Sequence, residues 1–191
     1  MKKILILHNK YIEEGGEDIA VDREINLLKE HFIVEEILVT NKSTSFIKIL
    51  TIFLMNSNFE INKLLKQKIE TFQPDLVYVH NTWFSISLGI FDNLFKYNIP
   101  VYLKIHNFRY FCTRTHFSSV HFDNNNFCQA CGNMKSSMRF YNKYYESFLK
   151  SLFVNRYGKK YYKILADSRV VKIVLTDFHK KFLTDLGFDN K

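Results

Sequence analysis

A regular alternation of short apolar runs with amphipathic stretches is the feature of this sequence that most constrains its fold. The apolar runs predict β-strands over residues 4–7, 33–39, 76–80, 101–106 and 170–176. The amphipathic spacing predicts helices over residues 17–30, 43–72 and 85–97. Further helices are predicted to end at about residue 166, and a last helix begins at residue 177. Strands and helices that alternate in this way form a parallel sheet covered by helices on both faces. The sequence therefore predicts the α/β class.

The composition is that of one globular domain. The chain has 191 residues, of which 47% are hydrophobic, and this is enough to bury a full core. The N-terminus lacks a secretory pattern, and no apolar run is long enough to cross a bilayer. Three cysteines, an odd number, argue against a disulfide framework. We expect a cytoplasmic protein.

Positive charge is concentrated in the second half of the chain. Residues 1–100 carry 11 Lys and Arg against 13 Asp and Glu, whereas residues 101–191 carry 16 against 6. Basic and aromatic residues alternate over 139–163, which fits peripheral association with anionic lipid at the inner face of a membrane. A solvated helix with its aromatic side chains in the core explains the same pattern. No nucleic-acid motif accompanies the charge, so nucleic acid is not an expected partner.

Gly15 and Gly16 stand between the first strand and the first helix. Glycine lets the backbone approach a ligand closely, and a helix N-terminus offers N–H groups to an anion. A phosphorylated or sugar-phosphate ligand fits this position. A tight strand-to-helix turn without a ligand fits it equally, because the spacing is not that of a Rossmann or Walker glycine motif.

Three predicted strands end in a His-Asn pair. The pairs are His8-Asn9, His80-Asn81 and His106-Asn107. Carboxyl ends of parallel strands share one rim, where ligands of such sheets bind. There an imidazole accepts a proton from a sugar hydroxyl or binds a phosphate, and an amide hydrogen-bonds hydroxyls. The alternative is that the histidines cap or pack the strand ends.

The stretch from about 107 to 135 shows neither helical nor strand periodicity and is predicted to be a long loop. It contains Cys112, Cys128 and Cys131. With His116 or His121 as the fourth ligand, these thiolates would form a structural zinc site. Three free thiols are the alternative.

Two apolar features each have two interpretations. Residues 46–55, with Phe59, Ile61, Leu64 and Leu65, form either a surface for a lipid-linked acceptor or ordinary core. Trp83 and Phe84 either stack on a sugar ring or anchor the helix that follows them.

Three segments together resemble the N-terminal domain of family 4 glycosyltransferases. They are His8-Asn9-x-Tyr11 with Gly15-Gly16-Glu17-Asp18, then Pro74-Asp75-Leu76-Val77-Tyr78-Val79-His80-Asn81-Thr82, then His106-Asn107-Phe108-Arg109-x-x-Cys112 with Cys128-x-x-Cys131. The resemblance covers nearly the whole chain. It implies that residues 1–191 are the N-terminal, acceptor-binding half of a GT-B fold, a Rossmann-like domain whose C-terminal counterpart binds the nucleotide sugar. Such enzymes commonly extend polysaccharide, lipopolysaccharide or capsule chains on lipid carriers.

The same resemblance implies roles for individual residues. His106 would lie beside the reacting hydroxyl, and Gly15 and Gly16 would approach the donor phosphates. Arg109 would bind an acceptor phosphate. The remaining acceptor-binding candidates are His8, Asn9, Tyr11, His80, Asn81 and Asn107. No cofactor is required for the chemistry.

From these features we expect a glycosyltransferase that transfers a sugar from a nucleotide donor to a polysaccharide or lipid-linked acceptor. The sequence ends at Lys191, where the family's linker to the donor domain would begin, so we expect the activity to be incomplete without that domain or a partner chain. The alternative is a binding module or inactive remnant that holds a glycan, a lipid phosphate or a partner protein without chemistry.

Overall fold

The computed structural model describes residues 1–41, 46–108, 110–111 and 148–188, which belong to two compact units. The first unit comprises Met1–His106 and Ser168–Lys191, and the second comprises Asn107–Asp167. The described elements of the first unit are β1 (Lys3–Lys10), α1 (Gly16–His31), β2 (Ile33–Thr40), α2 (Phe46–Met55), α3 (Phe59–Phe72), β3 (Leu76–Val79), α4 (Gly89–Leu94), β4 (Val101–Ile105), β5 (Val170–Val174) and α7 (Asp177–Asp185). In the second unit the described helix is α6 (Phe148–Ala166).

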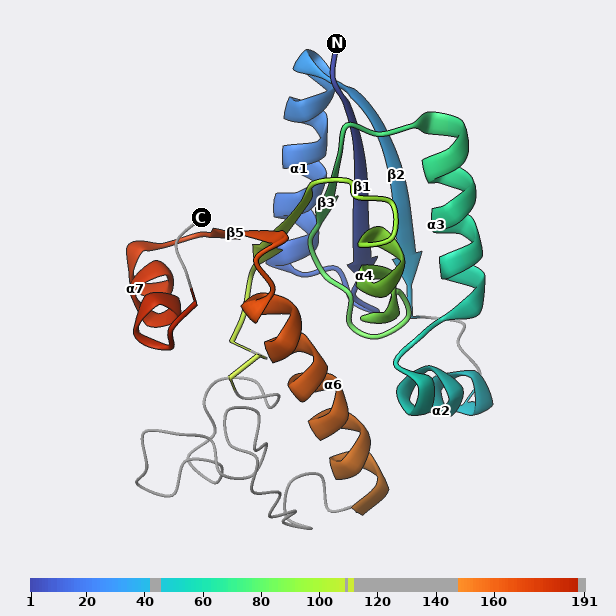
Figure 1. The fold of residues 1–191 in the computed structure, drawn as a ribbon, viewed down its shortest axis with the longest axis vertical. Helices are drawn as coiled ribbons and strands as arrows, with labels where there is room; N and C mark the ends of the chain where they lie inside the picture. The colour runs from blue at the N-terminus through green and yellow to red at the C-terminus, as the bar shows by residue number, and fades with distance from the viewer. Residues whose placement is uncertain (42–45, 109, 112–147, 189–191) are drawn as a thin grey trace. The chain divides into compact units, whose positions relative to one another are not determined.

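The five strands form one parallel sheet in the order β2-β1-β3-β4-β5, which confirms the predicted α/β class and is consistent with a Rossmann-like fold (Figure 1). The chain moves outward from β1 to β2 and then returns across β1 to β3. Both crossover connections have the same hand, but the one from β1 to β2 and the one from β2 to β3 run in opposite directions across the sheet. The helices α1 and α3 therefore lie on opposite faces. The strand order thus reverses between β1 and β3, and ligands of open α/β sheets bind beyond the strand ends at such a point.

Both faces of β1 are buried, as expected of a strand inside a parallel sheet. On one face Ile4, Ile6 and Tyr78 form a cluster with Val21 and Ile25 of α1. The residues between them on β1 and β3 point to the opposite face, where α3 and α4 lie. These residues are Leu5, Leu7, Val77 and Val79, all fully buried. The core therefore has two layers, with the sheet between them.

The helical region predicted over residues 43–72 is two helices, α2 and α3. Asn56 takes a left-handed backbone conformation (φ 48°), which ends the first helix. The Asn58 side chain accepts hydrogen bonds from the backbone N–H groups of Glu60 and Ile61, and so caps the second. The sequence Asn56-Ser57-Asn58 carried this break signal, which the apolar spacing around it obscured.

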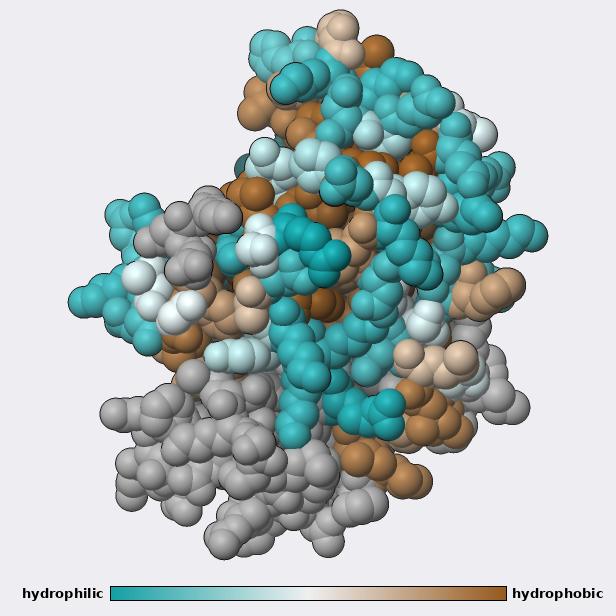
Figure 2. All heavy atoms as spheres, viewed as in Figure 1, coloured by the Kyte–Doolittle hydropathy of each residue, from teal (hydrophilic) through white to brown (hydrophobic). Residues whose placement is uncertain are grey.

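The apolar residues of α2 and α3 divide between core and surface. Ile52, Ile61 and Leu65 are buried, whereas Met55 and Phe59 are exposed by 69% and 82%. Figure 2 shows the hydrophobic side chains gathered at the lower right, over the position of α2 in Figure 1. Ordinary core packing thus accounts for the buried part of this stretch, whereas a surface for a lipid-linked acceptor stays a prediction for the exposed part. None of the helices in the described ranges combines the length and apolar character needed to span a bilayer.

The helix predicted over residues 85–97 is only the short α4. Ser87 has a positive φ of 65°, which interrupts a helix before Gly89. A Cβ at Gly89 would come within 2.8 Å of the Asn56 carbonyl oxygen and of Ser57 Oγ. Close approach of two chain segments therefore requires glycine at this position.

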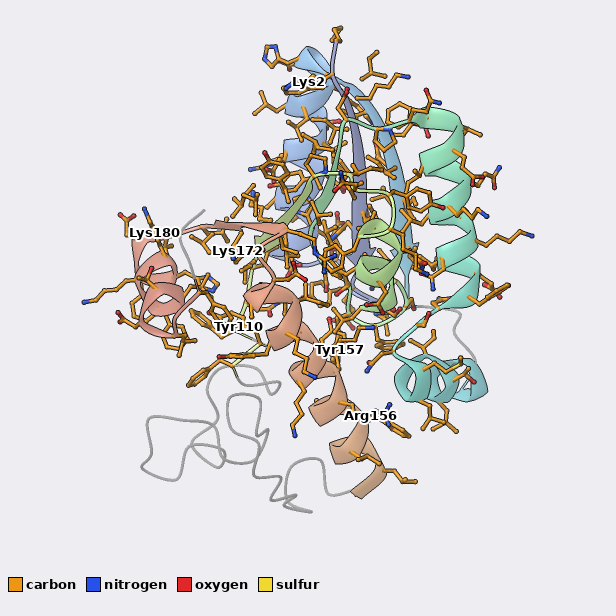
Figure 3. The ribbon with its side chains drawn as sticks, viewed as in Figure 1. Lys2, Tyr110, Arg156, Tyr157, Lys172 and Lys180 are labelled. Carbon is orange, nitrogen blue, oxygen red and sulfur yellow. The ribbon has the colours of Figure 1, made fainter. Side chains whose placement is uncertain are left out.

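In the second unit, α6 buries aromatic side chains. Phe153, Tyr157 and Tyr161 are buried, and the Tyr161 ring lies 6.3 Å from that of Tyr110. Arg156, on the same helix as Tyr157, is exposed (Figure 3). For this part of the basic and aromatic stretch, the pattern is that of a packed helix. Residues 139–147 lie outside the described residues, and association with lipid stays a prediction.

We expect Gly89→Ala to lower the free energy of unfolding by about 1–3 kcal/mol, because the added methyl group overlaps backbone atoms of residues 56 and 57. Gly16→Ala is the matched control, since a Cβ there meets nothing within 4 Å. Urea denaturation of both variants measures the difference. Equal stability of the two would contradict the close packing at Gly89.

Candidate functional site

The three predicted rim histidines come together at the carboxyl ends of adjacent strands. His8 lies near the end of β1, and His80 and His106 directly follow β3 and β4. Leu7 pairs with Val79, so the next residues, His8 and His80, lie side by side on one face of the sheet. Ring centroids are 6.0 Å apart for His8 and His80, and 5.5 Å for His80 and His106. The cluster lies where the strand order reverses.

One hydrogen bond joins two of these rings, and another joins the third ring to a carboxylate. His80 Nδ1 and His106 Nε2 are 3.2 Å apart, so one of the two nitrogens donates to the other. His8 Nε2 lies 2.8 Å from Asp18 Oδ1. His8, His80 and Asp18 are buried, whereas His106 is partly exposed. His106 is therefore the member of the cluster that is most accessible to a ligand.

Asp18, in the first turn of α1, holds the segment between β1 and α1 in place. Its carboxylate accepts hydrogen bonds from the backbone N–H groups of Gly15, at 3.1 Å, and of Tyr11, at 3.4 Å. These bonds are additional to the one with the His8 ring. The Tyr11 hydroxyl in turn donates to Glu17 at 2.9 Å. A carboxylate in the first helical turn also interacts favourably with the helix dipole. One buried side chain thus connects a rim histidine to the glycine segment.

Neither glycine of that segment is required by its backbone conformation. Gly15 has φ −113° and ψ 174°, which any residue adopts. A Cβ at Gly15 would meet only Tyr11 Cδ2, at 4.0 Å, and one at Gly16 would meet nothing within 4 Å. There is open space beside the start of α1. This space is compatible with the predicted approach to donor phosphates, which stays a prediction.

The environment keeps the imidazoles neutral. Burial above all, with the nearby His106, His8 and Lys104, lowers the pKa of His80 to about 2. Burial, with Lys104 and His8, lowers the pKa of His106 to about 4. Burial also lowers the pKa of His8, against the opposing effect of Asp18. At neutral pH each ring therefore has one N–H donor and one lone pair able to accept a proton.

A second polar group lies on the same face of the sheet, next to the histidines. Glu24 of α1 accepts hydrogen bonds from the Tyr78 hydroxyl at 2.7 Å and from Lys104 Nζ at 2.5 Å. The Tyr78 ring centroid is 4.3 Å from that of His80. Glu24 thus fixes α1 to β3 and β4 directly beside the cluster.

The two asparagines of the central strands differ in what they still offer a ligand. Asn9 uses both amide atoms within the chain: Oδ1 accepts from Ile86 N at 3.3 Å, and Nδ2 donates to the Lys10 carbonyl at 3.1 Å. Asn81 Oδ1 accepts from Trp83 N at 2.9 Å, while its buried Nδ2 has no partner among the described residues. Asn81 therefore retains a donor, and acceptor binding by either residue stays a prediction.

Sequence reasoning missed two members of this region. Asp18 entered only as part of a motif, although an acidic residue three positions after a helix cap is a known signal. His179 is a fourth buried histidine, at the start of α7 after β5, and it contributes to the lowered pKa of His106. Burial also lowers the pKa of His179 itself. Its place after a strand end was the available signal.

Several predicted site residues stay predictions. Asn107 belongs to the second unit. Arg109, the three cysteines Cys112, Cys128 and Cys131, and the candidate ligands His116 and His121 lie outside the described residues. In the part of the chain that the structure describes, no three His, Cys, Asp or Glu side chains are grouped so that they could hold a metal ion.

Comparisons with models of protein families, with curated proteins and with solved structures find no match to this chain. The resemblance to family 4 glycosyltransferases rests on its motifs alone.

We expect Asp18→Ala to lower the free energy of unfolding by about 1–3 kcal/mol, because it leaves a buried donor of His8 and a partly buried donor of Gly15 without this acceptor. Asp22→Ala is the control, since it removes a partly exposed ion pair with Lys10 and should cost about 0–1 kcal/mol. Thermal and urea unfolding measure both. A smaller loss for Asp18→Ala than for Asp22→Ala would contradict the central place of Asp18.

The lowered pKa of His80 predicts a specific pH dependence of stability. Below its ordinary pKa of about 6.5 the unfolded chain takes up a proton, whereas folded His80 does not until about pH 2. The free energy of unfolding therefore falls as the pH drops below 6.5. His80→Gln should reduce that slope by up to about 1.4 kcal/mol per pH unit. Urea titrations from pH 7 to 4, with exposed His31→Gln as control, measure the slope; an unchanged slope in His80→Gln contradicts the prediction.

Proposed function

We propose that this chain forms the acceptor side of a glycosyltransferase. In this proposal the rim of the sheet holds a hydroxyl group of a glycan or lipid-linked acceptor, and a nucleotide sugar is the donor. The observation that carries the proposal is the cluster of neutral imidazoles at the strand-order reversal, with His106 partly exposed and hydrogen-bonded to buried His80. A neutral imidazole held in place by a second group is suited to accept a proton from a hydroxyl.

The proposed reaction exchanges one bond at the anomeric carbon of the transferred sugar for another. The acceptor oxygen forms a bond to the anomeric carbon while its proton passes to His106. The bond between the anomeric carbon and the donor phosphate oxygen breaks, and the nucleoside diphosphate leaves with the electron pair. Because His106 is neutral at working pH, it has a lone pair for this proton. The proton-accepting role is typically worth about 10²–10⁴-fold in rate.

The donor phosphates are proposed to lie near Gly15 and Gly16. The start of α1 is compatible with this, since space is open beside Gly16 and a helix N-terminus attracts negative charge. The groups that bind the nucleotide are proposed to come from a further domain or a partner chain. Trp83 follows the His80-Asn81 pair and is half-buried, and its backbone N–H donates a hydrogen bond to the Asn81 side chain. Its ring is a candidate for stacking on an acceptor sugar.

A second candidate is a binding module that uses the same rim without chemistry. Asn81 Nδ2, which is buried and has no partner within the described ranges, favours it, because one directed donor is enough to bind a hydroxyl and contributes no proton acceptor. In that case the His106 imidazole would contribute to affinity but not to a rate.

We expect His106→Gln to lower sugar transfer by about 10²–10⁴-fold, because an amide side chain does not accept the proton. The assay supplies a nucleotide-binding donor domain together with the chain, uses a panel of nucleotide sugars with lipid-linked and polysaccharide acceptors, and follows radioactive sugar into the acceptor. His31→Gln, which changes an exposed histidine at the end of α1, is the control and should leave transfer unchanged.

Acceptor binding, followed by calorimetry with the same glycans, separates the two candidates. Transfer lost with binding retained in His106→Gln supports the enzyme. Glycan binding without transfer by the unchanged protein, in the presence of every donor and of the added donor domain, supports the binding module. Transfer that survives His106→Gln overturns the assigned role of His106.

A further inference from the structure

Three large apolar side chains are exposed where α2 passes into α3. Leu54, Met55 and Phe59 are exposed by 47%, 69% and 82%, and we call them the apolar tip. Figure 2 shows hydrophobic side chains at the surface over the position of α2. Exposed apolar side chains are common singly, whereas several of them within residues 54–59 indicate a contact surface.

The turn that carries the apolar tip is fixed to the segment that follows β3. Asn58 caps α3 through its Oδ1, and its Nδ2 donates to the Ser85 carbonyl at 2.6 Å. The Asn56 carbonyl and Ser57 lie so close to Gly89 that a Cβ at that glycine has no room. The segment from Ser85 to Gly89 follows the second His-Asn pair of the rim. The apolar tip therefore has a set position relative to the end of β3.

The apolar tip lies at the same end of the sheet as the histidine rim. In Figure 1 the arrowheads of β1 and β2 point toward the level of α2, so α2 lies beyond the carboxyl ends of these strands. The rim histidines also lie at the carboxyl ends of their strands. A surface that covered the apolar tip would thus adjoin the end of the sheet where the acceptor is proposed to bind.

Lysines stand along α3 behind the apolar tip. Lys63 and Lys66 follow Phe59 by four and seven residues, which places them on the same face of the helix. Both lysines are exposed. Glu70, which is 3.7 Å from Lys66 in an exposed ion pair, lies a further turn away from the tip. Glu60 is about 100° around the helix from Phe59. The face that carries the tip is therefore cationic in its first two turns.

We propose that the apolar tip inserts into the interface of an anionic lipid bilayer, with Lys63 and Lys66 facing the lipid headgroups. Apolar side chains backed by lysines are typical of peripheral membrane contact. A net charge of +8 adds long-range attraction to an anionic surface. A stable protein interface takes roughly 20–30 residues a side, far more than the tip provides. The membrane contact makes the acceptor a lipid-linked one, and this last step rests on the proposed function.

The experiment is flotation of the full chain with vesicles of phosphatidylcholine, with and without phosphatidylglycerol. We expect the chain to float with the vesicles that contain phosphatidylglycerol. Met55→Gln/Phe59→Gln should lower the partition coefficient at least about tenfold, because it removes two inserted apolar side chains. Ile19→Gln/Leu27→Gln, which changes two exposed apolar residues of α1, is the matched control and should leave partition unchanged. Circular dichroism verifies that each variant is folded.

The lysines are tested in the same assay. Lys63→Gln/Lys66→Gln should lower partition by about fivefold for each lysine, and raising the salt concentration should reduce this difference. Lys180→Gln/Lys181→Gln, which changes two exposed lysines of α7, is the control of equal charge. Equal losses in the two lysine variants would overturn the headgroup contact, because charge alone would then explain them.

Three outcomes would overturn the membrane contact. The first is that the unchanged chain does not float with either kind of vesicle. The second is that Met55→Gln/Phe59→Gln floats like the unchanged chain, which would assign binding to another part of the protein. The third is a dimer without lipid that this variant dissociates in size-exclusion chromatography, since a second copy would then cover the tip. The vesicles contain no sugar donor or acceptor, so failed transfer with retained flotation would overturn only the proposed function.

Discussion

The hydrogen bonds of the buried Asp18 carboxylate are the interaction on which the rest of the site depends. They connect the last residues of β1, the segment that leaves it and the first turn of α1. Removing a carboxylate from water is costly unless its oxygens are hydrogen-bonded, and here three donors and the helix dipole compensate for that cost. Because the same carboxylate fixes the His8 ring, the position of α1 and the hydrogen bonding of His8 depend on each other.

The α1 face of the sheet changes character along the strands. Near their beginning it is apolar, with Ile4, Ile6 and Tyr78 packed against α1. Toward the carboxyl ends polar groups replace the apolar ones, first the ion pair of Glu24 with Lys104 and then the histidines. Lys104 and burial both favour neutral rings, so the cationic charge lies on the lysine rather than on the cluster. The opposite face carries the apolar layer of Leu5, Leu7, Val77 and Val79, on the side of α3 and α4.

Sequence reasoning predicted the sheet from the alternation of short apolar runs with amphipathic stretches, and it predicted the meeting of the histidines because carboxyl ends of parallel strands share one rim. It failed where a long-range contact decides the backbone. The positive φ of Ser87, which precedes the short α4, and the close approach of residues 56 and 57 to Gly89 are not revealed by any local pattern. The hydrogen bond between His8 and Asp18 could not be predicted locally, because it depends on both the position of β1 in the sheet and the path of the segment between β1 and α1. The function was predicted from motif resemblance alone, which carries no information on burial or hydrogen placement.

The pairing of β1 with β3 disfavours a shift in the register of these two strands. Side chains alternate along a strand, so shifting β3 by one residue would turn His80 toward the face covered by α3 and α4, away from its hydrogen-bond partner His106. The same shift would bring Val79 against the polar groups of α1. Misaligned chains would thus bury unpaired imidazole and lose packing at once. The polar groups of the rim therefore favour the correct register of β1 and β3, since only that register pairs them with their hydrogen-bond partners.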